Sequence, residues 1–412
     1  MKRTIYLHPG LWKCGSSSIQ SFCELNRENL LKLGFCYPEN LKSKRLMGTD
    51  VPFLHEIGNL LMTENSVQAK RTLENFLSKV SEKNIILSGE NFLEEPVPEK
   101  LGYLFNQYKE IFDFKVIIYL RPFIEHIVSS WHQAIRVADP SCKYLSTSLE
   151  SYIEEKGDNV YNAVYEHIKL YEAYFGIENI IIQPFEKEQF VEGDLIKDFL
   201  SVCNISDFSN LVFPSKNDNV SLDRVTLEKL RYINKTLGHL NIDWPNCLKI
   251  KRNIVSQCDI KNKQPLVYSL NPKDIVKIAQ RFSKIENCIA DKYLRRDKLF
   301  TRDYSKDCIE NKSEYKGLSV DDMLQTQTWI QLILYDDIVG KFTQESVKLR
   351  NDLTKQVKSE FLTIQNKQVK QIEQKHFHGN VLVKLLANFL CSFVPFKRNR
   401  KVIRQFFLKK HP

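Results

Sequence analysis

Residues 4–18 read TIYLHPGLWKCGSSS, and this stretch decides the fold class of the chain. A short apolar run at 4–7 leads into a loop that contains two glycines. The residues after the second glycine have the apolar spacing of a helix, with Ile19, Phe22 and Cys23 on one face. The order strand, glycine-bearing loop and helix predicts a cradle for phosphate, because the first amides of a helix are free to donate hydrogen bonds.

The loop departs from the best-known phosphate loop in one respect. The P-loop of nucleotide triphosphatases has the pattern GxxxxGK[ST]. Gly10 and Gly15 match its spacing, and Ser17 stands at its hydroxyl position. Ser16, however, takes the place of the lysine, and Lys13 comes two residues before the second glycine. Such a loop suits a phosphate group but lacks the lysine that clasps a β- or γ-phosphate beside magnesium.

Apolar runs bounded by polar residues predict the strands of an α/β fold. These runs are 4–7, 84–88, 114–120 and 179–183. Continuous Ile, Val and Leu runs of this length are typical of parallel strands that are buried on both faces. Longer segments with helical spacing lie between them, and 189–300 is mainly helical in pattern. We therefore expect a P-loop-like, mostly parallel sheet flanked by helices over residues 1–304.

The character of the chain changes after residue 304, and a C-terminal helical extension is expected. Residues 305–340 are predicted to form a polar linker and a helix. Residues 341–375 are predicted to form a long helix with a narrow apolar stripe, as in a coiled coil. The stripe consists of Phe342, Leu349, Leu353, Val357, Phe361, Ile364 and Ile372. It indicates a homo-oligomer formed through 342–373.

Residues 376–412 form a basic, amphipathic tail in which apolar and basic residues interleave. No acidic residue follows Glu373, and the last 39 residues hold Lys375, Lys384, Lys397, Arg398, Arg400, Lys401, Arg404, Lys409 and Lys410. Residues 380–412 are therefore expected to lie on an anionic membrane surface. The alternative is a helix that packs on the main domain or on a second subunit.

Composition limits the remaining classes. The net charge of the 412-residue chain is +10, and nine of these charges belong to the last 39 residues, so no nucleic-acid partner is expected. The ten cysteines form no CxxC pair, which indicates free thiols in a reducing compartment rather than a zinc or redox site. Neither a signal peptide nor a run of ~18 apolar residues is found. The expected location is cytoplasmic, with peripheral attachment to the inner face of the cell membrane.

The loop resembles the 5′-phosphosulfate loop of the PAPS-dependent sulfotransferases, where PAPS is 3′-phosphoadenosine-5′-phosphosulfate. Loops of that family read roughly K-[TS]-G-[ST]-[ST] after the first strand. The matching residues, with the serine that follows, are Lys13, Cys14, Gly15, Ser16, Ser17 and Ser18. Cys14 departs from the usual Thr or Ser. Residues 26–38 resemble the bacterial, carbohydrate-modifying branch of the family.

A second, separate motif carries the same resemblance. In 116–133 an apolar run ends in Arg121, and Ser129 follows eight residues later, as in the R-x7-S motif that binds the 3′-phosphate in the family. The chemistry agrees, because the planar guanidinium of arginine binds phosphate with two parallel hydrogen bonds. Together the two motifs imply that Arg121 and Ser129 bind the donor with the loop.

Four residues are candidates for the chemical step. Lys13 would stabilise charge on the leaving phosphate, as the resemblance implies. Glu90 follows the run 84–88 at the edge where ligands bind open α/β sheets, and it is the first candidate for the general base. His8, which ends the first run, and His55, which resembles a histidine of the bacterial branch, are the next candidates.

The resemblance covers residues 1–304 and implies an enzyme that moves a sulfuryl group from PAPS to a carbohydrate hydroxyl. No metal is expected, and the acceptor is expected to be a cell-envelope glycan or glycolipid. Two alternatives stay open at this point. A P-loop kinase of a small metabolite has the same fold class, and a membrane-associated scaffold could retain the fold without turnover.

Overall fold

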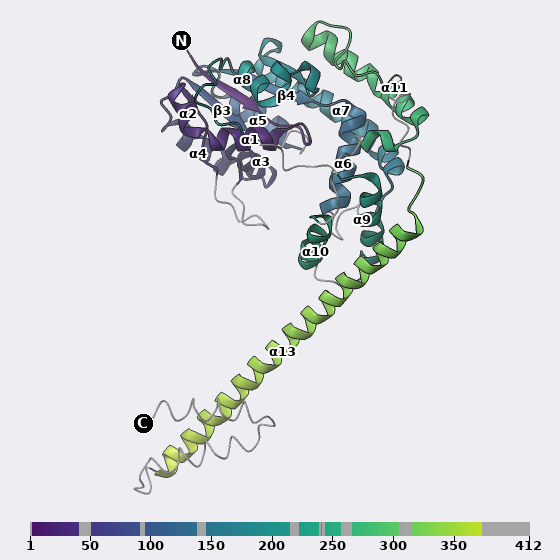
Figure 1. Ribbon diagram of the computed structural model, residues 1–412. Helices are drawn as coiled ribbons and strands as arrows, with labels where there is room; N and C mark the ends of the chain where they lie inside the picture. The colour runs from purple at the N-terminus through teal and green to yellow at the C-terminus, as the bar shows by residue number, and fades with distance from the viewer. Residues whose placement is uncertain are drawn as a thin grey trace. The chain divides into compact units, whose positions relative to one another are not determined.

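The computed structural model describes residues 2–40, 51–90, 95–137, 146–214, 222–238, 240, 244–256, 266–304, 306 and 315–372 (Figure 1). The chain divides into two units, Met1–Tyr335 and Asp336–Pro412. The basic tail predicted at 376–412 lies outside the described residues.

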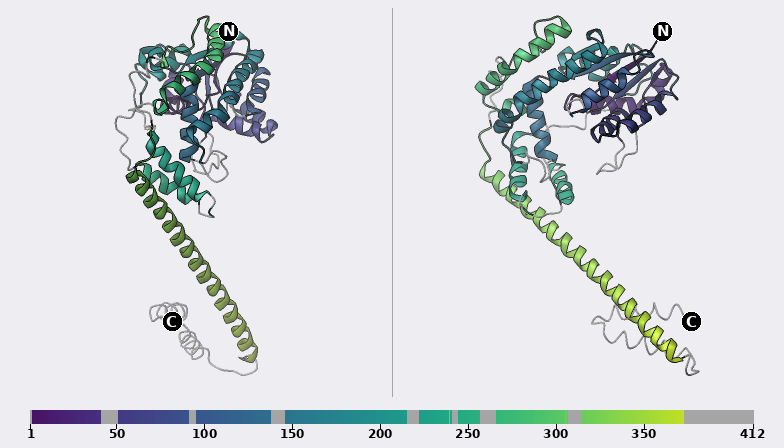
Figure 2. Two further views of the ribbon diagram at one scale, coloured as in Figure 1. Left: turned by 90° about the vertical axis from the view of Figure 1, so that its right-hand side faces the viewer. Right: turned by 180° about the vertical axis from the view of Figure 1, so that it is seen from behind.

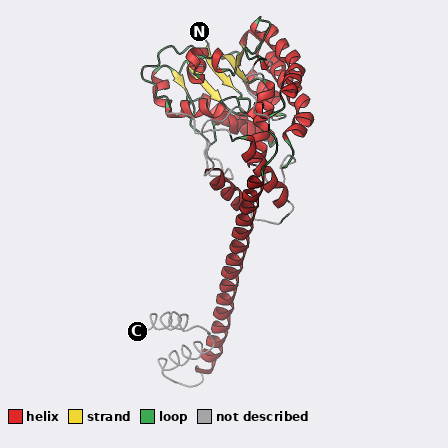
Figure 3. Cartoon of the chain, turned by 45° about the vertical axis from the view of Figure 1, so that its right-hand side comes forward, coloured by secondary structure: helices red, strands yellow, loops and turns green. Residues whose placement is uncertain are grey.

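The first unit is built on a five-stranded sheet with the order β2-β3-β1-β4-β5. The strands are β1 (Arg3–His8), β2 (Phe35–Cys36), β3 (Asn84–Ser88), β4 (Phe112–Leu120) and β5 (Ile180–Pro184). Every pairing is parallel, and helices flank the strands (Figure 3). The predicted α/β fold with a parallel sheet is confirmed, and four of its strands coincide with the four apolar runs.

The helices are α1 (Ser16–Leu25), α2 (Arg27–Lys32), α3 (Phe53–Met62), α4 (Ser66–Leu77), α5 (Val97–Asn106), α6 (Phe123–Val137), α7 (Leu149–Phe175), α8 (Leu195–Val202), α9 (Arg224–Leu237), α10 (Trp244–Ser256), α11 (Pro272–Ile289) and α13 (Val320–Ile372). Short helical turns are η1 (Ile177–Asn179), η2 (Lys187–Gln189), η3 (Val191–Gly193), η4 (Leu266–Ser269) and η5 (Ala290–Leu294).

The sheet topology brings three chain segments to one edge. β1 pairs with β3 on one side and with β4 on the other, so Ile5 lies opposite both Ile85 and Phe114. Because the three strands are parallel, the residues that follow them lie at the same carboxyl edge. These residues are the glycine-bearing loop after β1, Glu90 after β3 and Arg121 after β4. The fold therefore brings together the motifs that the sequence keeps far apart.

Helix α6 is held firmly by its neighbours. It packs against α7, α9 and α11 (Figure 1). Trp131 is fully buried, and its Nε1 donates to the carbonyl oxygen of Thr147 at 2.9 Å, so this tryptophan packs in the core. The guanidinium of Arg224 lies 4.9 Å from the Trp131 ring. The helix that carries Ser129 is thus a rigid element of the first unit.

The N-terminus of α6 meets a half-buried carboxylate from α11. Oε1 of Glu286 accepts the Phe123 amide at 3.0 Å. Burial raises the pKa of Glu286 from 4.5 to about 7, and the charges of Glu186 and Glu125 act in the same direction. Between these pH values the folded chain keeps a proton that the unfolded chain has released. The free energy of unfolding therefore falls as the pH rises from about 4.5 to 7.

Replacement of Glu286 by Gln tests this effect. The amide keeps an oxygen for the Phe123 amide and removes the charge. We expect the variant to gain up to about 3 kcal/mol over the wild type at pH 8 and almost nothing at pH 4.5. Chemical denaturation at both pH values measures the difference. An equal gain at both pH values would show that burial of the charge is not the cause.

Helix α13 is one continuous helix of 53 residues, Val320–Ile372 (Figure 2). The sequence suggested a boundary between two helices at 340/341, and the structure shows none there. The first turns belong to the first unit, where Asp322 pairs with Lys229 at 2.6 Å and Ile333 is buried. Among the described helices none is long and apolar enough to cross a membrane.

Candidate active site

The loop between β1 and α1 needs glycine at two positions. Gly10 has φ +61° and Gly15 has φ +80°, both in the left-handed region that glycine tolerates best. A Cβ on Gly10 would lie 2.0 Å from the carbonyl oxygen of Gly89, and one on Gly15 would lie 2.3 Å from Cδ2 of Leu195. Lys13 also adopts a positive φ, of 65°. The backbone is thus folded tightly around the start of α1.

Replacement of Gly10 by Ala is expected to lower the free energy of unfolding by at least about 3 kcal/mol, because a backbone carbonyl cannot move aside. Gly34 is the matched control. Its φ is +82°, but nothing lies within 4 Å of the added Cβ, so Gly34→Ala should cost only about 1 kcal/mol. Denaturant unfolding of both variants measures the difference. Equal losses would mean that the contact with Gly89 does not matter.

The start of α1 offers unpaired donors. Gly15 is the N-cap of the helix, and no side chain caps it. The amides of Gly15, Ser16 and Ser17 donate to no acceptor within the described part of the chain. Ser16 is buried and its hydroxyl turns back to Leu11, whereas the hydroxyl of Ser17 is exposed. An anion at this end of the helix would meet amides and the positive end of the helix dipole.

Lys13 points across the loop toward α6. Its Nζ donates to Oε1 of Gln133 at 2.8 Å. Burial lowers the pKa of Lys13, and the charges of Arg136 and Arg121 lower it further, while the charge of Glu90 opposes them. The ammonium group is thus partly desolvated and held among other cations. This position favours an incoming anion.

Glu90 follows β3 and connects this strand to the β1–α1 loop through two hydrogen bonds. Its Oε1 accepts the Ser17 hydroxyl at 2.9 Å, and its backbone carbonyl accepts Nε1 of Trp12 at 2.6 Å. The carboxylate therefore lies beside the free amides of α1. A general base in this place would stand next to a group bound by the loop.

Arg121 lies at the end of β4 beside the loop. Its Nε donates to Oε2 of Glu125 at 3.0 Å, and the guanidinium is 5.9 Å from the ring of Phe185. Glu125 also accepts hydrogen bonds from Arg302 and from the Tyr304 hydroxyl. This arrangement fixes the direction of the guanidinium and leaves the side chain partly exposed.

Cys14 is the residue that departs from the family pattern. It is fully buried, and burial raises the pKa of its thiol to about 12 although the nearby charge and amide of Arg121 lower it. The thiol is therefore neutral at physiological pH. It fills the position without adding a charge that would repel an anion.

One face of α6 carries further polar groups toward the loop, and sequence reasoning missed two of them. Ser129, Gln133 and Arg136 are spaced at i, i+4 and i+7, so they share a helix face. Arg136 forms no hydrogen bond or ion pair with any residue that the structure describes. Its charge nevertheless acts on Lys13. The helical spacing from Ser129 could have indicated Gln133 and Arg136 as site residues, but Gln and Arg on a helix usually face solvent.

Two histidines on the same helix are neutral at physiological pH. Burial lowers the pKa of His126 to about 4 and that of His132 to about 3, and the charge of Lys13 contributes to both. Nε2 of His132 is buried and has no hydrogen-bond partner among the described residues. The cationic character of the site therefore comes from lysine and arginine.

The remaining two candidates, His8 and His55, are buried. His8 is fully buried, its Nδ1 is 2.8 Å from the Ser88 hydroxyl, and its ring contacts Tyr119 and Phe199 edge-on. Burial lowers its pKa to about 3. His55 is buried in α3, where its backbone amide lies beside Gly89, next to Glu90. The structure does not bring His8 into the cluster around Lys13.

Comparisons with known proteins do not assign the chain to a family. No family model and no curated protein matches the chain. A crystal structure of a sulfotransferase from Alicyclobacillus acidocaldarius aligns with 53% of this chain and 87% of its own, at 16% identity and a TM-score of 0.33. So low a score carries no argument about activity. In the described residues, no three His, Cys, Asp or Glu side chains gather as a ligand set for a metal.

Proposed function

We propose that the chain is a PAPS-dependent sulfotransferase that acts on a carbohydrate hydroxyl. One observation carries the proposal: Lys13 is held by Gln133 beside the free amides of α1. Arg121 lies at the neighbouring strand end, and the Glu90 carboxylate after β3 accepts the Ser17 hydroxyl. A cationic loop with an adjacent carboxylate suits transfer of an anionic group to a hydroxyl. The resemblance of the two motifs selects sulfuryl among the anionic groups.

The donor would contact both motifs at once. The 5′-phosphosulfate would lie on the amides of Gly15, Ser16 and Ser17, with Lys13 beside it. The 3′-phosphate would accept hydrogen bonds from Arg121 and Ser129. Arginine suits this role because it binds phosphate through paired N–H groups. Cys14 and Ser18 would line the loop without contributing charge.

In the reaction the acceptor oxygen attacks sulfur, and the bond between sulfur and the bridging oxygen of the 5′-phosphate breaks. Glu90 would take the proton of the acceptor hydroxyl, and 3′,5′-adenosine bisphosphate would leave. Negative charge grows on the bridging oxygen as the bond breaks. Lys13 and the helix amides would stabilise that charge, which is where preorganised donors have their largest effect.

Calorimetric titration with 3′,5′-adenosine bisphosphate tests the proposal, with ATP and magnesium as the comparison. Binding of the bisphosphate that ATP does not match supports a sulfotransferase. The spacing of Gly10 and Gly15 favours a P-loop kinase as the second candidate, and tighter, magnesium-dependent binding of ATP would select it. Failure to bind either nucleotide would favour a scaffold.

Arg136 supplies a prediction about the donor. The charge of Arg136, which no described residue pairs, lies beside Lys13 and would attract the polyanionic donor without a dedicated hydrogen bond. Arg136→Ala should therefore weaken bisphosphate binding about tenfold in low salt, which is about 1.4 kcal/mol, and less in 0.5 M salt. Arg136→Lys should bind almost as the wild type. Calorimetry at both ionic strengths decides, and a loss that salt does not reduce would contradict this role.

The place of action is also part of the proposal. The basic tail would hold the enzyme on the cytoplasmic face of an anionic membrane, where an envelope glycan or glycolipid acceptor is assembled. Flotation of the full-length chain with vesicles of phosphatidylglycerol and phosphatidylcholine tests it. The protein should float with anionic vesicles and remain at the bottom with neutral ones. Sedimentation with both would remove the membrane from the proposal.

A further inference from the structure

The second half of α13 is a helix without a partner among the described residues. Every residue from 341 to 360 is exposed, including Phe342 at 72% and Leu349 at 63%. An isolated helix is marginal in water, because its stability in proteins comes mostly from packing one apolar face. A helix of this length with bare apolar side chains therefore indicates a missing partner.

The exposed apolar residues form a seam with heptad spacing. Val339, Ser346 and Leu353 occupy one core position in successive heptads, and Phe342 and Leu349 occupy the other, so four of these five core residues are apolar. The opposite face repeats with the same period, since it carries Lys341, Lys348 and Lys355. Apolar residues on one side and lysines every seven residues on the other are the pattern of a two-stranded coiled coil.

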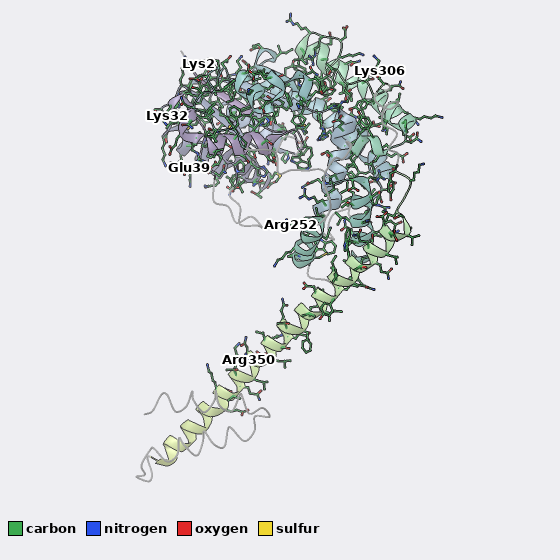
Figure 4. The ribbon with its side chains drawn as sticks, viewed as in Figure 1. Lys2, Lys32, Glu39, Arg252, Lys306 and Arg350 are labelled. Carbon is green, nitrogen blue, oxygen red and sulfur yellow. The ribbon has the colours of Figure 1, made fainter. Side chains whose placement is uncertain are left out.

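The charges beside the seam favour a second copy in parallel orientation. Glu345 and Arg350 flank the core and are five residues apart, which is the spacing that pairs the two helices of a parallel dimer. Each residue would meet its opposite in the partner, so the pair would occur twice. Arg350 is exposed on α13 (Figure 4). In an antiparallel dimer, heptad positions equivalent to Glu345 would instead face each other, as would those equivalent to Arg350, so these opposite charges would not pair.

The other candidate to cover the seam is the tail of the same chain. Residues 341–372 contain seven basic residues, which are Lys341, Lys348, Arg350, Lys355, Lys358, Lys367 and Lys370, against the three acidic residues Glu345, Asp352 and Glu360. A second copy is basic as well, but it brings Glu345 as an acidic partner for Arg350, whereas the tail after Glu373 contains no acidic residue. Charge therefore favours the second copy.

We propose that α13 forms a parallel, two-stranded coiled coil with a second copy of this chain, through a seam of Val339, Phe342, Leu349 and Leu353. This inference goes beyond the proposed function and does not depend on it. The partner is the same helix, recognised by its apolar seam and by reciprocal pairs of Glu345 with Arg350.

The test is the mass of the full-length chain in solution, by analytical ultracentrifugation at micromolar concentration. The wild type should have twice the 48.4 kDa of one chain. The double variant Phe342→Glu with Leu349→Glu should dissociate at concentrations at least about 100-fold higher than the wild type. Lys348→Ala, on the opposite face, is the matched control and should remain dimeric. Circular dichroism and unfolding of the first unit confirm that each variant is folded.

Charge exchange tests the orientation. Arg350→Glu alone should weaken the dimer, because it sets two acidic residues against each other twice. The double exchange Glu345→Arg with Arg350→Glu should restore it. A wild-type monomer, a dimer that survives both glutamates in the seam, or a double exchange that fails to rescue would each overturn the proposal. A monomer that aggregates only after removal of 376–412 would assign the seam to the tail.

Discussion

Arg121→Ala should weaken binding of 3′,5′-adenosine bisphosphate at least about 100-fold. Paired, charge-assisted hydrogen bonds to a phosphate contribute about 1.5–3 kcal/mol each, and the variant loses both. It also removes one of the two arginines that pair with Glu125, at 3.0 Å, so this carboxylate would repel the bound phosphate more strongly. Titration calorimetry of wild type and variant measures the change in Kd.

Arg281 provides the matched control for Arg121. It pairs with Asp158 on the surface of the first unit and is not part of the site. Arg281→Ala should bind the bisphosphate as the wild type does. Because Glu125 is also held by Arg302, the Arg121 variant should remain folded. Unchanged binding by Arg121→Ala would place the nucleotide elsewhere and would sink the assignment of the 3′-phosphate.

Lys13→Ala should lower the rate of sulfuryl transfer by about 10²–10³-fold, with a smaller effect on bisphosphate affinity. The reason is that charge on the bridging oxygen develops only as the sulfur–oxygen bond breaks, so Lys13 would act mainly on the transition state. Release of sulfate from PAPS to water gives a readout that does not need the acceptor. Single-turnover rates at saturating PAPS separate the rate from binding.

Two further variants serve as comparisons for Lys13→Ala: one tests the position of the lysine, and the other is a control. Gln133→Ala keeps the charge but removes the acceptor at 2.8 Å that positions it, so the rate should fall less, by about tenfold. Lys197→Ala, on an exposed lysine paired with Glu192, should have no effect. If Lys13→Ala lowered affinity and rate by the same factor as Arg121→Ala, Lys13 would be a binding group only.

The sheet was predictable because its strands are continuous apolar runs. β1, β3, β4 and β5 each contain a run of apolar residues that is typical of strands buried on both faces. β2 was missed, since its two residues, Phe35 and Cys36, are too short a pattern to detect. The continuity of α13 was missed because a polar helix carries little signal about its own ends, and Gly340 stands at the boundary that the sequence suggested.

The site was predictable only where topology decides position. Lys13, Glu90 and Arg121 each follow a strand of one parallel sheet, and this alone brings them to one edge. Gln133 and Arg136 depend on how α6 packs on the loop, which no local pattern encodes. Tertiary packing also decides the position of His8, in this case by removing a candidate from the charged cluster. Its place at the end of a strand made His8 a candidate for the general base, but contacts with Tyr119 and Phe199 bury its ring.

The packing of α6 has a consequence for ligand choice. Gln133 meets the loop lysine, and Ser129 lies one turn earlier, about 6 Å along the same helix axis. Because α7, α9 and α11 pack against this helix, the distance between Ser129 and Gln133 cannot adjust to the ligand. Under the proposed function, nucleotides would be sorted by the separation of their phosphate groups rather than by their total charge. A nucleotide with all its phosphates in a single chain would gain little affinity from the additional charge. Its phosphates would lie near only one of the two positions on α6.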